Sequence, residues 1–172
     1  HMKRHTIKPR NNMRNLSNFL ISSLLLLSSS AFANINSWSS EQVVDDFTDA
    51  TKTFATVYSE TGIKGGFITM GCYPGKSFEL KVSTGKYIGD KAINKNVKYR
   101  VDKDTPVQMT MKATSKRFVY INDMDSQFIK GLMNGKSTVL VQLTSYDYDT
   151  SKAKFSLKGS TAAIQKVIDA CK

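Results

Sequence analysis

The stretch GFITMGCYPGKSFELKVST, residues 66–84, carries the clearest strand and turn signals of the chain. Its segment Phe67 to Tyr73 is apolar on both faces, which predicts a central β-strand. Pro74-Gly75 is a turn signal, and from Phe78 to Val82 apolar and polar residues alternate, as in a strand with one solvated face. The stretch therefore predicts an antiparallel hairpin that carries Cys72 on its first strand.

The same alternation recurs along the chain and predicts a domain of short strands. A short helix is expected from Asp125, which would cap it, to Asn134-Gly135, which would end it. We expect a mainly β domain, α+β by content, in which antiparallel strands form a two-layer sandwich. The further strands are predicted at Phe54 to Ser59, Val97 to Val101, Val107 to Met111, Phe118 to Ile121, Thr138 to Leu143 and Ala153 to Leu157.

A second helix is predicted at the end of the chain, beginning after Gly159 with Ser160 or Thr161 as its cap. Its apolar residues recur at i, i+3, i+4 and i+7, which is one stripe of an amphipathic helix. The stripe therefore turns a cysteine of the last turn toward the core. Its members are Ile164, Val167, Ile168 and Cys171.

Cys72 and Cys171 are the only cysteines. In an oxidising compartment, two cysteines near the ends of a domain most often pair. A zinc site is excluded because the two lie far apart in the sequence and residues 34–172 contain no histidine to complete the ligand set. We therefore predict a Cys72–Cys171 disulfide that joins the C-terminal helix to an inner strand.

The first 33 residues resemble a signal peptide. They are basic without any acidic residue, have an apolar core from about Phe19 to Leu27, and end in Ala31-Phe32-Ala33. The apolar run is roughly 10 residues, against about 20 for a membrane-spanning helix. We expect residues 1–33 to be removed and residues 34–172 to form a single domain in the periplasm, with no stable membrane insertion.

The charge of that domain argues against a nucleic-acid partner. Residues 34–172 hold 20 Lys and Arg against 14 Asp and Glu, so the net charge is +6. All but Arg100 and Arg117 are lysines, whereas specific recognition of phosphates and bases favours arginine forks. The lysines indicate a solvated face, or attraction to an anionic partner such as an envelope surface or an acidic protein.

No set of residues suits an enzyme. Without histidine, a serine triad and a cysteine–histidine pair are excluded. The acidic pairs lie in predicted turns, where Asp caps backbone amides. No cofactor or metal is expected, and a carboxylate-dependent wall hydrolase is the one enzymatic alternative that these acids leave open. The pairs are Asp45 with Asp46, Asp123 with Asp125, and Asp147 with Asp149.

One loop is a candidate interface. Tyr146, Asp147, Tyr148 and Asp149 lie between the last two predicted strands. Exposed tyrosines in loops are enriched at protein interfaces. We predict that this loop contacts a protein partner in the cell envelope.

Six short motifs occur in a particular order between Trp38 and Cys171. By this order the chain resembles the VasI family of type VI secretion-associated proteins. The resemblance implies the fold and the compartment, and it implies no catalytic set. The motifs are Trp38, Met70-Gly71-Cys72, Tyr87-Ile88-Gly89-Asp90, Tyr99-Arg100-Val101-Asp102, Phe128-Ile129-Lys130 with Leu132, and Phe155-Ser156-Leu157-Lys158-Gly159 followed by Ala163-Ile164 and Ala170-Cys171.

Two functions follow as expectations. The first is a non-enzymatic periplasmic accessory or binding protein of the VasI kind, which presents a surface to an envelope partner. The alternative is an immunity or inhibitor protein against a cell-wall-active toxin or a lysozyme-like enzyme. A compact, lysine-rich exported domain suits this alternative, because charge complementarity would steer it into an acidic cleft.

Overall fold

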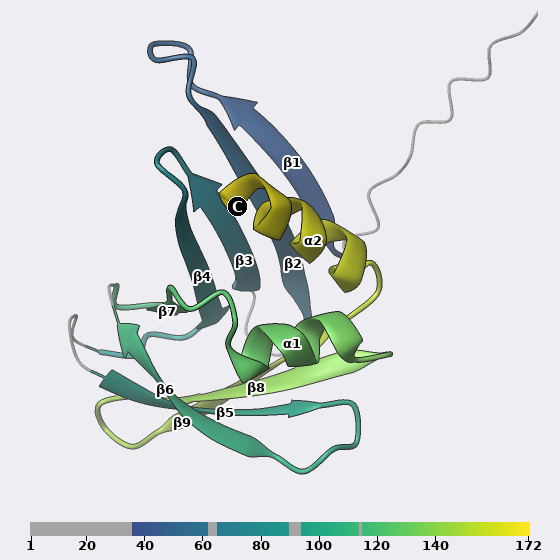
Figure 1. Ribbon diagram of the computed structural model, residues 1–172. Coiled ribbons are helices and arrows are strands. Elements are labelled where there is room, and N and C mark those ends of the chain that lie inside the picture. The colour runs from purple at the N-terminus through teal and green to yellow at the C-terminus, as the bar shows by residue number, and fades with distance from the viewer. Residues whose placement is uncertain (1–35, 62–64, 90–93, 114) are drawn as a thin grey trace, which may run out of the picture. The chain divides into compact units, whose positions relative to one another are not determined.

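The computed structural model describes residues 36–61, 65–89, 94–113 and 115–172, which belong to one compact unit (Figure 1). The predicted signal peptide, residues 1–33, lies outside the described residues.

Within this described part the chain forms nine strands and two helices. In chain order they are β1 (Ser39–Val44), β2 (Thr51–Thr61), β3 (Gly66–Tyr73), β4 (Ser77–Thr84), β5 (Asn94–Val101), β6 (Val107–Ala113), β7 (Val119–Ile121), α1 (Gln127–Asn134), β8 (Thr138–Thr144), β9 (Thr150–Ser156) and α2 (Ser160–Cys171).

The strands form a closed antiparallel barrel. The strand order is β1-β2-β3-β4-β7-β6-β5-β8-β9, and β2 also pairs with β9, so eight strands close and β1 extends the sheet beyond β2. The mainly β antiparallel fold is confirmed, but the two-layer sandwich is wrong. The physical reason is the length of β2, whose first part pairs with β1 and β3 while Ser59 and Thr61 pair with β9.

The predicted hairpin is confirmed as β3 and β4, in which Met70 lies opposite Leu80 and Cys72 opposite Phe78. Alternate residues of each barrel strand are buried, as period-2 sequences require. A barrel of eight strands is just wide enough to be filled by such side chains. The buried interior includes Ala55, Val57, Ile68, Met70, Leu80, Val82, Val97, Met111, Val119, Val141, Leu143 and Phe155.

The short helix α1 begins one residue later than the sequence predicts. Ser126, not Asp125, is its N-cap, and the Ser126 side chain accepts a hydrogen bond from the Ile129 N–H at 3.4 Å. The backbone N–H of Asp125 instead donates to the carboxylate of Asp123 at 3.0 Å. Phe128 is fully buried, and its ring lies 4.7 Å from that of Tyr99 in an edge-on contact.

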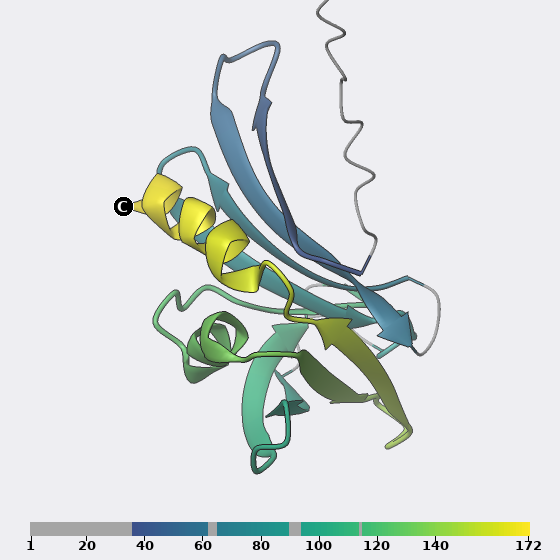
Figure 2. The same cartoon turned by 90° about the vertical axis from the view of Figure 1, so that its right-hand side faces the viewer.

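The C-terminal helix α2 lies against β1, β2 and β3 and also contacts α1 (Figures 1 and 2). Neither predicted side chain caps it. Gly159 is the N-cap, with a left-handed backbone at φ 80° that favours glycine, and makes no side-chain bond. Thr161 instead donates its hydroxyl to the Met133 carbonyl at the end of α1, at 2.6 Å. No helix in the described ranges is long and apolar enough to span a membrane.

The predicted disulfide is confirmed. Cys72 on β3 and Cys171 in the last turn of α2 are bonded, with their Cα atoms 5.5 Å apart. Val167, on the same stripe of α2, is fully buried, as the periodicity predicts. The bond therefore ties α2 to an inner strand across a separation of 99 residues.

The strand β1 was not predicted, because its sequence SSEQVV lacks alternation. It follows Trp38, which is buried and donates its indole N–H to the Ser156 carbonyl at 2.9 Å. The Trp38 backbone N–H also donates to the Lys158 carbonyl at 3.0 Å. These two bonds attach the start of the domain to the end of β9.

Removing the disulfide should destabilise the domain strongly. Replacing both Cys72 and Cys171 by Ala should lower the free energy of unfolding by about 2–5 kcal/mol, because a loop of roughly 100 residues is no longer closed in the unfolded chain. Urea unfolding followed by circular dichroism measures this change. A strong reductant should shift the wild-type midpoint equally and leave the double variant unchanged. An unaltered wild-type midpoint under reductant would contradict the role given to the bond.

Candidate functional site

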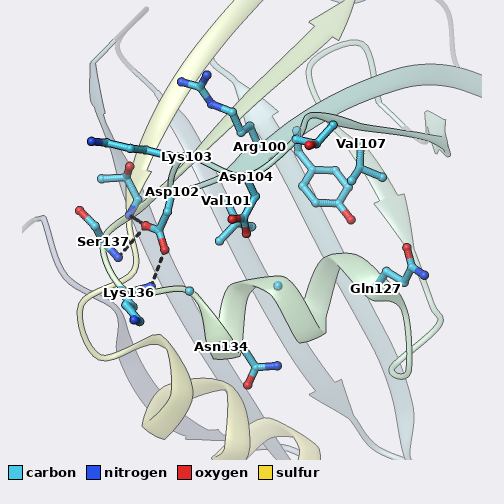
Figure 3. A pocket seen from close by; sticks show the side chains of 15 residues that line it. Arg100, Val101, Asp102, Lys103, Asp104, Val107, Gln127, Asn134, Lys136 and Ser137 are labelled. Carbon is cyan, nitrogen blue, oxygen red and sulfur yellow. Dashed lines mark hydrogen bonds between the residues drawn. The ribbon is translucent and has the colours of Figure 1, made fainter.

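A cleft of about 840 Å³ opens between α1, the turn from β5 to β6 and the loop from α1 to β8 (Figure 3). Its walls carry several charged and polar side chains. The labelled residues around it are Arg100, Val101, Asp102, Lys103, Asp104, Val107, Gln127, Asn134, Lys136 and Ser137.

Asp102 has a structural task in this cleft. Its carboxylate accepts hydrogen bonds from the backbone N–H groups of Lys136 at 2.8 Å, Ser137 at 2.8 Å and Thr138 at 2.9 Å. These bonds favour the charged form, and the bonds from Lys136 and Thr138 are the largest causes that hold the pKa of Asp102 below its ordinary value. Asp102 therefore fastens the loop after α1 to the end of β5.

The carboxylates that line the cleft are consequently poorly suited to acid–base catalysis. Hydrolysis by two carboxylates needs one of them as an acid and the other as a base or nucleophile. Of the two acids that line the cleft, Asp102 already accepts three backbone bonds, which leaves Asp104 alone. Across the described ranges, no group of three His, Cys, Asp or Glu residues is arranged to hold a metal ion.

The predicted interface loop lies at the turn between β8 and β9 and exposes its tyrosines. Tyr146 is 62% exposed and Tyr148 is 88% exposed. The loop is braced from within, because the Ser145 N–H donates to the Asp149 carbonyl at 2.8 Å and the Ser145 hydroxyl donates to the Asp147 carboxylate. Tyr148 has a left-handed backbone at φ 62°, which points to a tightly defined turn.

A third tyrosine joins these two from a distant part of the chain. Tyr87, after β4, is 43% exposed, and its ring meets that of Tyr146 edge-on at 6.2 Å. A Cβ at Gly89 would lie 2.6 Å from the Tyr146 ring, so the Tyr146 side chain rests directly on the backbone there. We call Tyr87, Tyr146 and Tyr148 the tyrosine surface.

Both acidic side chains of the predicted loop form bonds that hold the loop in place. The Lys86 ammonium pairs with the Asp149 carboxylate, and this hydrogen bond is the main cause that lowers the pKa of Asp149. The bond from the Ser145 hydroxyl is the main cause that lowers the pKa of Asp147. Of the four predicted interface residues, the structure therefore places Tyr146 and Tyr148 outward and uses both Asp side chains as braces.

The hairpin of β1 and β2 presents another exposed aromatic residue. Phe47, at its tip, is 98% exposed. The Asp45 carboxylate accepts bonds from the Phe47 and Thr48 N–H groups, both at 3.1 Å, which confirms the turn-capping role predicted for Asp45. The tip extends past the turn between β3 and β4 in both views of the ribbon (Figures 1 and 2).

Sequence patterns alone did not predict an interface role for Tyr87 or Phe47. Tyr87 lies on a segment whose partner in space, Tyr146, is 59 residues further along, and no local pattern signals that contact. Phe47 follows Asp45-Asp46, and an aromatic beside two acids in a turn is the signal that could have found it.

Comparison with protein-family models, with curated proteins and with solved structures finds no match to this chain.

The Asp102 clamp predicts an acid-dependent stability. Because the folded pKa of Asp102 is lowered, its contribution is complete above the ordinary value near 3.8 and is lost as the pH falls through the folded value. Asp102→Asn should therefore lower the thermal midpoint at pH 7 and have a smaller effect at pH 2 to 3, which calorimetry across pH measures.

Asp104→Asn is the matched control, because the Asp104 backbone N–H, rather than its side chain, makes the bond in this turn. It should leave the pH dependence of the midpoint unchanged. Equal shifts for both variants would show that the charge of the turn matters and that the clamp does not.

Proposed function

We propose that this protein is a non-enzymatic, exported accessory protein of the bacterial cell envelope, which binds a protein partner through the tyrosine surface. The observation that carries the proposal is the exposure of three neighbouring tyrosines, of which Tyr146 (62%) and Tyr148 (88%) lie on a braced loop and Tyr87 (43%) packs against Tyr146.

Tyrosine suits such a contact. It offers a large, partly polar contact area and has few rotatable bonds to order on binding, so it is frequent at interface hot spots. The Lys86–Asp149 ion pair, the Ser145–Asp147 bond and the close approach to Gly89 hold the loop before any partner arrives. A preorganised surface loses less conformational entropy on binding, which favours affinity.

The compartment is supported by two independent features. The basic, apolar and small-residue regions of residues 1–33 follow the pattern of a signal peptide. The Cys72–Cys171 bond suits an oxidising compartment such as the periplasm, since disulfides are rare where thiols are kept reduced. The order of motifs from Trp38 to Cys171 resembles the VasI family, which favours an accessory role beside a type VI secretion system.

The non-enzymatic character is supported by the residues themselves. Residues 34–172 contain no histidine, and the described part of the chain shows Asp45, Asp102, Asp123 and Asp147 each accepting backbone or side-chain bonds in a turn. Carboxylates used in this way stabilise loops and are poorly placed to transfer protons to a substrate.

An inhibitor of a wall-degrading enzyme is the second candidate, and the Phe47 tip favours it. A capped turn that presents a 98% exposed phenylalanine at the end of a two-stranded extension has the form of a plug for an apolar subsite of a cleft. The binding surface would then be the hairpin tip instead of the tyrosine surface.

Cross-linking tests the proposal. A benzophenone amino acid placed at Tyr148, in protein secreted by its native host, should cross-link one envelope protein, which mass spectrometry identifies. With that partner purified, Tyr146→Ala/Tyr148→Ala should weaken binding by roughly 10- to 100-fold, because hot-spot truncations cost about 1.5–3 kcal/mol.

The control is Tyr58→Ala, which removes another exposed tyrosine, on β2, and should leave the affinity unchanged. Retention of full affinity by the double variant would overturn the tyrosine surface. Capture of a wall hydrolase that is inhibited by wild type, but not by Phe47→Ala, would favour the inhibitor over the accessory protein.

A further inference from the structure

A second surface lies on the outer wall of the barrel. It is a shallow hollow of about 190 Å³ over β5, β8 and β9. We call it the basic hollow. Its lining comprises Lys98, Tyr99, Arg100, Pro106, Leu140, Gln142 and Lys152.

The strand register gathers the charges of this hollow. Lys98 lies opposite Gln142, which in turn lies opposite Lys152, so one row crosses three strands. Arg100, two residues along β5, lies opposite Leu140. All three cations are exposed, and Leu140 beside Arg100 is half-buried.

In the described part of the chain, these cations have no acidic partner. By contrast, Lys154, which lies opposite Leu140 at the edge of the hollow, pairs with Glu60 at 3.3 Å, and Lys81 on β4 pairs with Glu79 at 2.7 Å. Within the described ranges, no carboxylate lies within ion-pair distance of Lys98, Arg100 or Lys152. The hollow therefore concentrates positive charge that the fold itself leaves uncompensated.

Arg100 also lacks a structural task, in contrast to its neighbours on the chain. Tyr99 packs against Phe128, Val101 is buried beside α1, and Asp102 clamps the loop after α1. The Arg100 side chain points away from α1 (Figure 3). It is one of only two arginines in residues 34–172.

We infer that the basic hollow binds an extended acidic segment of a protein partner, whose carboxylates lie at alternate positions and therefore all face the hollow. Along a strand, residues i and i+2 lie about 7 Å apart. Lys98 and Arg100 have this spacing, and so do the acids of an alternating extended segment. The inference rests on the proposed function, since it takes the protein to act by binding a partner.

The geometry favours a protein segment over other anions. Lys98 and Lys152 lie two strands apart, about 10 Å, which is wider than one phosphate group. The exposed large apolar residues of the described chain are not among those that line the hollow, so nothing there would insert into a lipid bilayer. Carboxylates that project from alternate residues of one extended segment can reach cations separated in this way.

Fluorescence anisotropy tests the inference on protein purified from the periplasm of an expression host. The probe is a labelled peptide of alternating Glu and Leu, compared with a peptide of the same composition whose acids form one block. The wild type should bind the alternating peptide more tightly, and salt should weaken this binding. Lys98→Gln/Arg100→Gln/Lys152→Gln should weaken it about tenfold or more.

The charge-matched control is Lys130→Gln/Lys158→Gln/Lys166→Gln, which removes three exposed cations outside the hollow. It should change the affinity by less than about threefold, since it alters only the long-range field. Equal losses for both triple variants would overturn the hollow as a site. Absence of wild-type binding, or equal competition by inorganic phosphate or by anionic phospholipid vesicles, would also overturn it.

A variant of the tyrosine surface distinguishes failure of the basic hollow from failure of the proposed function. Tyr146→Ala/Tyr148→Ala should bind the alternating peptide with wild-type affinity, because those residues do not line the hollow. Failure of peptide binding with intact cross-linking at Tyr148 would overturn the hollow alone. Failure of cross-linking with intact, hollow-dependent peptide binding would overturn the tyrosine surface alone.

Discussion

The pairing of β2 with β9 is the constraint on which the rest of the structure depends. β2 has eleven residues, so its first part can pair with β1 and β3 while its end pairs with β9. This pairing turns an open sheet into a barrel and pairs the edge of β9, which in an open sheet would be free to template unwanted strand pairing. Trp38 strengthens the same seam, because it donates to carbonyls at the end of β9 and just beyond it.

Closure also determines how the helices are held. The chain leaves β9 directly into α2, so the position of β9 sets where α2 begins. At its other end α2 is bonded through Cys171 to Cys72 on β3, and near its start Thr161 bonds to the end of α1. The helix is therefore fixed to α1 near its start and to β3 at its end, both distant in sequence, which limits local opening of that face.

Both proposed binding surfaces include residues of the hairpin of β8 and β9. The tyrosine surface uses the turn of this hairpin, and the basic hollow uses its outward residues Leu140, Gln142 and Lys152. The hairpin is paired with β5 on one side and β2 on the other, so it is a wall of the barrel and not a loose loop. Sites carried by such rigid elements hold their geometry better than sites on free loops.

Local sequence patterns were enough to predict most of the strands, the buried face of the strand at Phe78 to Val82, and the turn of Cys171 toward the core on the stripe of α2. Those features depend on local periodicity, in which each residue reports its own burial. The sequence also identified the two loop tyrosines. Only the tertiary structure decided the barrel over the sandwich, the strand β1, the meeting of Tyr87 with Tyr146, and the gathering of Lys98, Arg100 and Lys152. Each of these depends on which segments lie side by side, and strand neighbours are selected by long-range pairing that leaves no periodic signal in either segment.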